Sequence, residues 1–225
     1  MGVSLTALLI TGCRSAPGRP TLADFPLRPT DVTDFRTLYL GNCAGCHGAD
    51  GRFGAAIDLN NPVYLGIVDD TSLRHVIAQG VPGTPMPPFA QEAGGSLTGH
   101  QIDLLIAGIR DKWAGAPGAA DGAPSYSLGT AGNLENGAQV YASNCQSCHG
   151  PDASGPIAAG SVVDPSFLSL VSNQYLRTIV IAGRPDLGHP DWKHAASGQP
   201  LTVQQVADVV AWLVSKRPAT LSSRK

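Results

Sequence analysis

The chain has 225 residues, of which 43% are hydrophobic and 14% are charged, and its formal net charge is −2. This length suffices for one large domain or two small ones. The near-neutral charge, with no basic run, argues against nucleic acid as a partner. The 27 glycines and 18 prolines favour short elements joined by long, shaped loops.

The N-terminus has the pattern of a bacterial lipoprotein signal peptide, assigned to residues 1–12. Its apolar stretch, residues 3–11, is too short to span a bilayer and ends at Gly12-Cys13, which resembles a lipobox. Cys13 is also the odd one of five cysteines, so we expect it to carry a lipid anchor, with residues 13–30 as anchor and tether. A plain signal peptide and an uncleaved leader are the alternatives. The rest of the chain outweighs the N-myristoylation pattern "MGVSLT".

Most of the remaining sequence occurs twice. The stretch "YLGNCAGCHGADG" at 39–51 returns as "YASNCQSCHGPDASG" at 141–155. The stretch "LRHVIAQGVPGTPMPPF" at 73–89 returns as "LRTIVIAGRPDLGHPDW" at 176–192. The order of the landmarks is the same in both copies, which indicates a duplication with small loop insertions.

This repetition predicts two domains of similar architecture, each too small to rely on a hydrophobic core alone. The segment between the copies is rich in Gly, Ala, Ser and Pro, which is typical of a linker. The predicted boundaries are 31–114 for the first domain, 115–132 for the linker, 133–218 for the second domain and 219–225 for a tail.

Each repeat predicts the same series of helices, and no convincing strand is found. A first helix is expected to begin at about Asp31 or Leu134 and to run into the cysteine motif. A short helix follows in each repeat and ends at a glycine. A closing helix then begins after an N-cap threonine, Thr98 or Thr202. Its i, i+3, i+4, i+7 apolar stripe comprises Ile102, Leu105, Ile106 and Ile109 in the first repeat and Val206, Val209, Val210 and Leu213 in the second.

The central motif of each repeat is C-x-x-C-H, the attachment motif for c-type haem. Two cysteines at this spacing can form thioether bonds to one edge of the porphyrin, and the adjacent histidine is then held under the iron. Zinc sites and redox dithiols also use C-x-x-C and are the alternatives. The motif residues are Cys43, Cys46 and His47 in the first repeat and Cys145, Cys148 and His149 in the second.

With these motifs the chain resembles the class I cytochromes c in their tandem dihaem form, over about residues 31–217. The resemblance implies an all-α fold of two domains, each holding one covalent haem c where its first and last helices cross. It also implies outer-sphere electron transfer, with no bound substrate transformed at the haem. The second repeat keeps the family's helix-packing Gly137 and Tyr141 spacing, whereas Phe35 replaces the glycine in the first and predicts a wider crossing.

The resemblance also implies a second axial ligand for each iron. Met86, 39 residues after His47, is expected to ligate haem 1. The second half contains no methionine, and His189, 40 residues after His149, aligns with Met86 and is the predicted ligand of haem 2. His194 and water are the alternatives there.

A carbonyl in each proximal loop is expected to orient the proximal imidazole. The family pattern places this carbonyl in the segment Gly155-Pro156 of the second repeat and Gly54-Ala55 of the first.

The predicted function is electron transfer without a catalytic residue. The protein is expected to be lipid-anchored on the periplasmic side of a bacterial membrane or at the cell surface. Its expected partners are redox proteins or a respiratory or photosynthetic membrane complex, and the four lysines favour a docked subunit over a diffusing carrier. His/Met ligation raises a haem potential, so haem 1 should have the higher potential. The alternative is a dihaem redox enzyme, peroxidase-like or thiosulfate-oxidising, with haem 2 as its active site.

Overall fold

The computed structural model describes residues 18, 20–21, 24–115, 117–127, 129–155 and 159–218. The predicted signal peptide 1–12, the anchor residue Cys13 and the tail 219–225 lie outside these residues. The chain forms two compact units, Met1–Val32 and Thr33–Lys225, and the second contains both repeats.

The described part of the first unit contains one short 3-10 helix, η2 (Pro29–Asp31). Arg28 and Asp31 form an ion pair of 2.7 Å there. The prediction that the first long helix begins at about Asp31 is wrong by a few residues. Helix α1 (Phe35–Asn42) begins later because the Asp34 side chain accepts a hydrogen bond from the Thr37 backbone N–H, 2.7 Å away, and so caps it.

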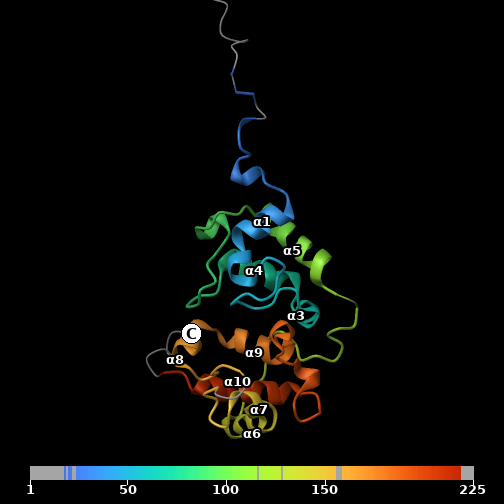
Figure 1. Cartoon of the computed structure of the whole chain (residues 1–225), viewed down its shortest axis with the longest axis vertical. Coiled ribbons are helices and arrows are strands. Elements are labelled where there is room, and N and C mark those ends of the chain that lie inside the picture. The colour runs from blue at the N-terminus through green and yellow to red at the C-terminus, as the bar shows by residue number, and fades with distance from the viewer. Residues whose placement is uncertain are drawn as a thin grey trace, which may run out of the picture. The chain divides into compact units, whose positions relative to one another are not determined.

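The predicted all-α architecture is confirmed: the described residues contain no β-strand, only two isolated bridges. Figure 1 shows the helices of both repeats. None of the described helices is long and apolar enough to cross a membrane. The first repeat comprises α1, α2 (Ala44–His47), α3 (Pro62–Ile67), α4 (Asp70–Gln79), η3 (Gln91–Ala93) and α5 (Gly99–Trp113). The second comprises α6 (Leu134–Asn144), α7 (Gln146–His149), α8 (Pro165–Leu170), α9 (Asn173–Ala182), η4 (Pro185–Leu187), η5 (Trp192–His194) and α10 (Val203–Ser215).

The closing helices α5 and α10 begin at the predicted threonines. Each has a full capping box, in which the threonine side chain accepts from the N3 backbone while the N3 glutamine side chain accepts from the threonine N–H. All eight residues of the predicted apolar stripes are buried. Local capping and 3.6-residue periodicity therefore define both closing helices.

An arginine from the C-terminal part of each repeat binds the end of the short helix that follows the C-x-x-C-H motif, α3 or α8. Arg110 of α5 donates to the carbonyls of Leu65 and Val68 at the end of α3. Arg217, just after α10, donates to the carbonyls of Leu168 and Val171 at the end of α8. Each guanidinium satisfies carbonyls that a helix end leaves unpaired, although the two arginines do not occupy equivalent sequence positions.

In both repeats the first and last helices pack at a glycine. The glycine belongs to the last helix in the first repeat and to the first helix in the second repeat. In the second repeat Gly137 of α6 lies against the backbone of Asp208 in α10, with no room for a Cβ. In the first repeat Phe35 of α1 occupies the equivalent position. Its ring lies so close to Gly108 of α5 that a Cβ on residue 108 would overlap it. An aromatic ring thus separates α1 from α5 where α6 and α10 approach through backbone.

Substituting Gly137 by valine is expected to destabilise the protein by about 1–3 kcal/mol, because the new side chain has to displace the α10 backbone. Chemical denaturation of the two purified variants and the wild type measures the loss. Gly41→Ala in α1 is the control, since nothing lies within 4 Å of the position of its Cβ. Helix propensity alone should make that variant slightly more stable. Equal stability of the two variants would contradict the close approach at Gly137.

Candidate functional site

The histidine of each C-x-x-C-H motif is oriented by a backbone carbonyl. Nδ1 of His47 lies 2.8 Å from the carbonyl oxygen of Ile57, and Nδ1 of His149 lies 2.9 Å from that of Gly160. A carbonyl only accepts, so each Nδ1 carries a proton, and Nε2 is the ring nitrogen left for a metal ion. A histidine held in this way by its second nitrogen is typical of a metal ligand. Burial lowers the pKa of His47, which further favours the neutral imidazole.

The carbonyls that do this differ from those predicted. Ala55 does not accept from His47, and Pro156 lies outside the described residues. The loops return to the motif through the Ala56 N–H, which donates to the Cys46 carbonyl at 2.9 Å, and the Ala159 N–H, which donates to the Cys148 carbonyl at 3.2 Å. The carbonyl that reaches the imidazole therefore belongs to the residue after each alanine.

The motif cysteines are free thiols at the start of short helices, and the second of each pair is exposed. Burial raises the pKa of Cys43 to about 11 and that of Cys145 to about 11. Thiols of this kind are protonated near neutral pH, whereas redox dithiols use a cysteine with a lowered pKa. The arrangement therefore favours covalent attachment over dithiol chemistry.

A tyrosine fixes the backbone just after each histidine. The hydroxyl of Tyr39 donates to the Gly48 carbonyl at 2.9 Å, and that of Tyr141 donates to the Gly150 carbonyl at 2.6 Å. Burial raises the pKa of Tyr141 to about 12, so its hydroxyl remains a donor. The two bonds connect the first helix of each repeat to the end of its motif.

The loops with the predicted second ligands share a glycine turn and one main-chain hydrogen bond. Each follows a glycine with a positive φ, +67° at Gly80 and +66° at Gly183. The residue after Gly80 donates its N–H to the Met86 carbonyl at 3.0 Å, and the residue after Gly183 donates to the His189 carbonyl at 3.1 Å. Met86 and His189 therefore occupy equivalent places, as their alignment predicts, and both are half-buried.

In the second repeat the structure brings the two predicted ligands together. The ring centroids of His149 and His189 lie 6.1 Å apart, with the ring planes at 53°. Two imidazoles on one first-row metal ion, with metal–nitrogen bonds of about 2 Å, have centroids roughly 6 Å apart. Nδ1 of His189 is buried and has no hydrogen-bond partner among the described residues. A buried ring nitrogen of this kind is costly unless something binds it.

His194 is arranged differently from His189. Its side chain is 72% exposed, and its Nδ1 lies 2.7 Å from Asp191. The Asp191 side chain also accepts from the His194 backbone N–H at 3.0 Å, so the histidine belongs to a surface cap. His75 and His100 are exposed.

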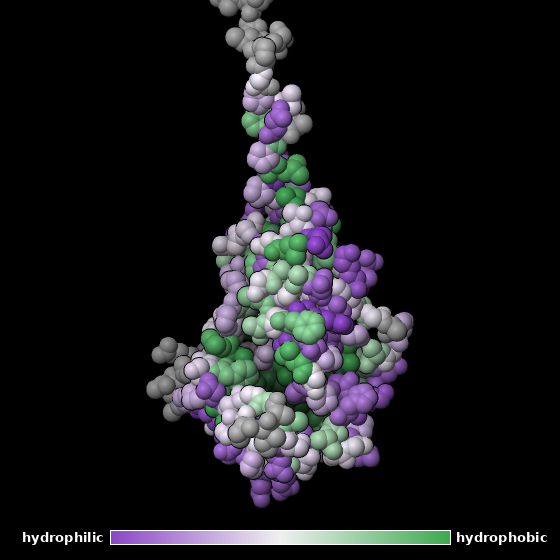
Figure 2. All heavy atoms as spheres, viewed as in Figure 1, coloured by the Kyte–Doolittle hydropathy of each residue, from purple (hydrophilic) through white to green (hydrophobic). Residues whose placement is uncertain are grey.

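The residues present fit two covalently bound haems. Each repeat offers two free thiols and a histidine whose Nδ1 is bonded to a carbonyl, and the second adds a nearby imidazole with an unpaired buried nitrogen. Figure 2 shows apolar side chains gathered around a hollow on one face of the unit that holds the repeats. An apolar surround of this kind suits a porphyrin and affects its potential.

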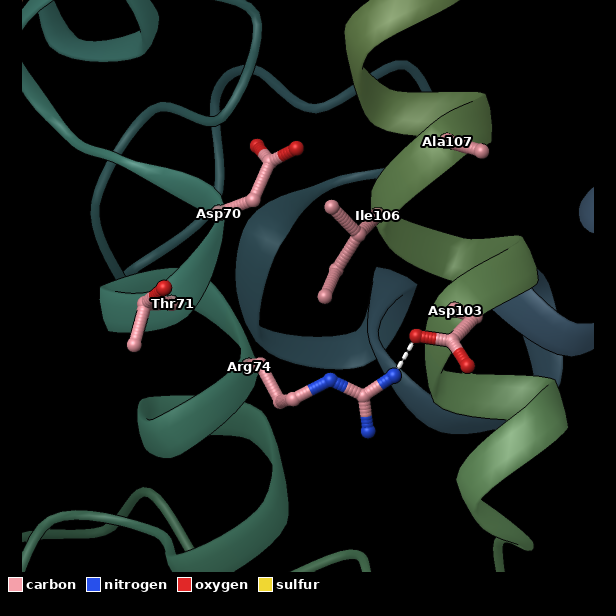
Figure 3. A pocket seen from close by; sticks show the side chains of 6 residues that line it. All are labelled: Asp70, Thr71, Arg74, Asp103, Ile106 and Ala107. Atoms are coloured by element: carbon pink, nitrogen blue, oxygen red, sulfur yellow. Dashed lines mark ion pairs between the residues drawn. The ribbon is translucent and has the colours of Figure 1, made fainter.

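A separate pocket lies between α4 and α5, where Arg74 forms an ion pair with Asp103 (Figure 3). None of the predicted haem ligands lines it, and we assign it to the packing of these two helices. Its lining residues are Asp70, Thr71, Arg74, Asp103, Ile106 and Ala107.

Comparisons with known proteins identify the family of the chain. The family described as "Cytochrome C oxidase, cbb3-type, subunit III" matches residues 30–107 and 132–213. The chain is 33% identical over 144 residues to the Cbb3-type cytochrome c oxidase subunit CcoP of Azospirillum sp., which covers 56% of this chain and 41% of that protein. It is 28% identical over 148 residues to the subunit FixPc of Rhizobium leguminosarum bv. viciae, which covers 62% and 46%. The chain therefore spans less than half the length of these relatives.

Among solved structures, cytochrome CL from Methylophaga aminisulfidivorans is 25% identical, with a TM-score of 0.33. The match covers 39% of this chain and 58% of that one.

Replacing Tyr141 by phenylalanine is expected to reduce the free energy of unfolding by about 1 kcal/mol, because a buried hydrogen bond to the Gly150 carbonyl is lost. Tyr39→Phe should cost about the same, since it removes the equivalent bond to Gly48. Urea titration of each variant, with haem content measured beside it, tests this. Unchanged stability in both variants would contradict the role given to the two hydroxyls.

Proposed function

Because the chain belongs to the family of cbb3-type cytochrome c oxidase subunit III, we propose that it passes electrons to a membrane-bound respiratory oxidase as a docked dihaem subunit. It is a tandem cytochrome c with two covalently attached haem c groups. We assign one haem to each domain, 31–114 and 133–218, joined by the linker 115–132. The oxidase and the direction of transfer are proposals, since the chain spans only part of its relatives.

Bound haem supplies one-electron chemistry, because its iron cycles between the ferric and ferrous states. The protein residues attach the porphyrin, supply its axial ligands and set the surroundings. We assign attachment to Cys43 and Cys46 in the first domain and to Cys145 and Cys148 in the second.

The proximal ligands in this proposal are His47 and His149, each held by its carbonyl. Met86 completes the first site. His189 completes the second, and the observation that supports it best is the 6.1 Å separation of its ring from that of His149. The exposed, Asp191-bound side chain of His194 argues for the same choice.

Unequal ligation would give the two sites different roles. Axial ligands and surroundings spread haem potentials over roughly 0.8 V, and a Met/His pair raises the potential. Haem 1 would then be the higher-potential centre and haem 2 the lower. Electrons would run downhill from the second domain to the first.

For location, we propose export and a lipid anchor at Cys13, on the periplasmic side of the membrane. The support is the apolar stretch that ends at Gly12-Cys13 together with the c-type motifs. A lipid-anchored chain would hold both domains close to a membrane-bound partner through its proline-containing tether.

Replacing His189 by methionine is expected to raise the midpoint potential of haem 2 by a fraction of the roughly 0.8 V range. The variant should also replace one bis-imidazole ferric signal, because a thioether is a weaker donor to ferric iron. Potentiometric titration with low-temperature EPR measures both changes. The midpoint of haem 1 should stay where it is.

His194→Ala is the control for this experiment and should leave both midpoints unchanged. If it, and not His189→Met, changes the second haem, the assignment of His189 is wrong. A high-spin ferric haem in the wild type, lost only on changing the second domain, would instead favour the enzyme alternative with haem 2 as its active site.

Cys13→Ser is expected to abolish lipidation without affecting haem content, because Cys13 lies outside both haem motifs. The intact mass of the mature wild-type chain should correspond to a start at Cys13 plus a lipid, and the variant should lack both. A wild-type chain without added lipid mass would refute the anchor, whether the protein is found in the membrane or in the soluble fraction of the cells.

A further inference from the structure

Arg184 of the second repeat makes a buried contact with the first repeat. Its guanidinium donates to the carbonyl of Ala56 at 2.9 Å and to that of Gly54 at 3.0 Å. It also pairs with Asp186 through two bonds of 2.9 and 2.8 Å. Asp186 in turn accepts from the backbone N–H of Phe53 at 2.9 Å. Arginine and aspartate together thus hold the backbone of residues 53–56.

Both ends of this contact reach a proposed axial ligand. The backbone N–H of Arg184 donates to the His189 carbonyl at 3.1 Å, and the backbone N–H of His189 donates to the Arg184 carbonyl at 3.0 Å. At the other end, Ala56 immediately precedes Ile57, whose carbonyl orients His47. One side chain therefore connects the loop of the distal ligand of haem 2 with the loop that orients the proximal ligand of haem 1.

The contact is specific to the second repeat. The equivalent loop of the first repeat has Val81 in place of Arg184 and Gly83 in place of Asp186. Val81 keeps the backbone bond to the ligand residue but has no group that could reach another domain. The loop that has His189 in place of methionine is therefore also the loop that carries the buried Arg184–Asp186 ion pair, which contacts the first repeat.

Arg184 places a positive charge close to both loops. Its guanidinium binds the backbone just before the carbonyl that orients His47, and its own backbone is bonded to that of His189. Ferric iron carries one more positive charge than ferrous iron, so a nearby cation should favour the ferrous form of a haem at either site.

We propose that Arg184, paired with Asp186, is a positioning residue that couples the two haem sites: it fixes the His189 loop against the His47 loop and sets the potentials of both haems together. The inference rests on the proposed function, since it needs both histidines as axial ligands. It goes beyond that function because it assigns one residue of the second domain an effect on the haem of the first.

Two substitutions of opposite sign test the coupling by potentiometric titration of the haem-loaded protein. Arg184→Gln removes the cation, so both midpoints should fall, that of haem 1 included. Asp186→Asn removes the anion, so both midpoints should rise. Arg184→Lys keeps the charge without the paired hydrogen bonds and should restore most of the shift seen with glutamine.

Arg217→Gln is the matched control, because Arg217 is also a buried arginine that binds carbonyls but only within its own repeat. It should reduce stability and leave the midpoint of haem 1 at its wild-type value. The coupling would be overturned if only the midpoint potential of haem 2 shifted in the Arg184 and Asp186 variants, or if their haem 1 midpoint equalled that of this control. A wild type without a bis-imidazole signal would instead overturn the proposed ligation, which separates the two failures.

Discussion

The arrangement of each repeat depends on one hydrogen bond, from Nδ1 of the motif histidine to a backbone carbonyl. This bond fixes the tautomer and the ring direction, and so makes Nε2 available to an iron. To place the Ile57 or Gly160 carbonyl there, the loop has to fold back onto the motif, where an alanine N–H binds the carbonyl of the second cysteine. The tyrosine of the first helix then binds the glycine carbonyl that follows the histidine.

The duplicated chain keeps this proximal frame and changes the distal side. Gly80 and Gly183 turn the backbone in the same way, and the same main-chain bond holds the ligand residue in each loop. The side chains differ, with Met86 in one loop and His189 in the other, and so does one hydrogen bond. The His189 N–H donates to the Arg184 carbonyl at 3.0 Å, whereas the Met86 N–H donates to the Thr84 hydroxyl at 3.3 Å. In the proposed function, this exchange of side chains between equivalent loops would give the two haems unequal potentials.

Elsewhere the repeats reach the same packing with residues that do not align. Arg110 and Arg217 bind equivalent helix ends from different positions, because a long guanidinium can reach the same carbonyls from either place. The glycine at the helix crossing lies in α6 in the second repeat and in α5 in the first, since the close contact needs a residue without a side chain on only one of the two helices. At these points tertiary packing requires a given volume and a given set of hydrogen bonds. It does not require the same residue at the aligned position.

The sequence alone predicted the all-α fold, the closing helices with their caps and buried stripes, and the two C-x-x-C-H motifs. These features are local, because capping, periodicity and motif spacing act within one or two helical turns. It also excluded methionine as a ligand of haem 2, since the second half has none.

Only the tertiary structure decided which carbonyls orient His47 and His149, that the ring of His189 faces that of His149, and that Arg184 reaches the first repeat. Arg184 and Ala56 are 128 residues apart in the chain. Contacts of this kind depend on how long loops close and pack, and no local pattern encodes that.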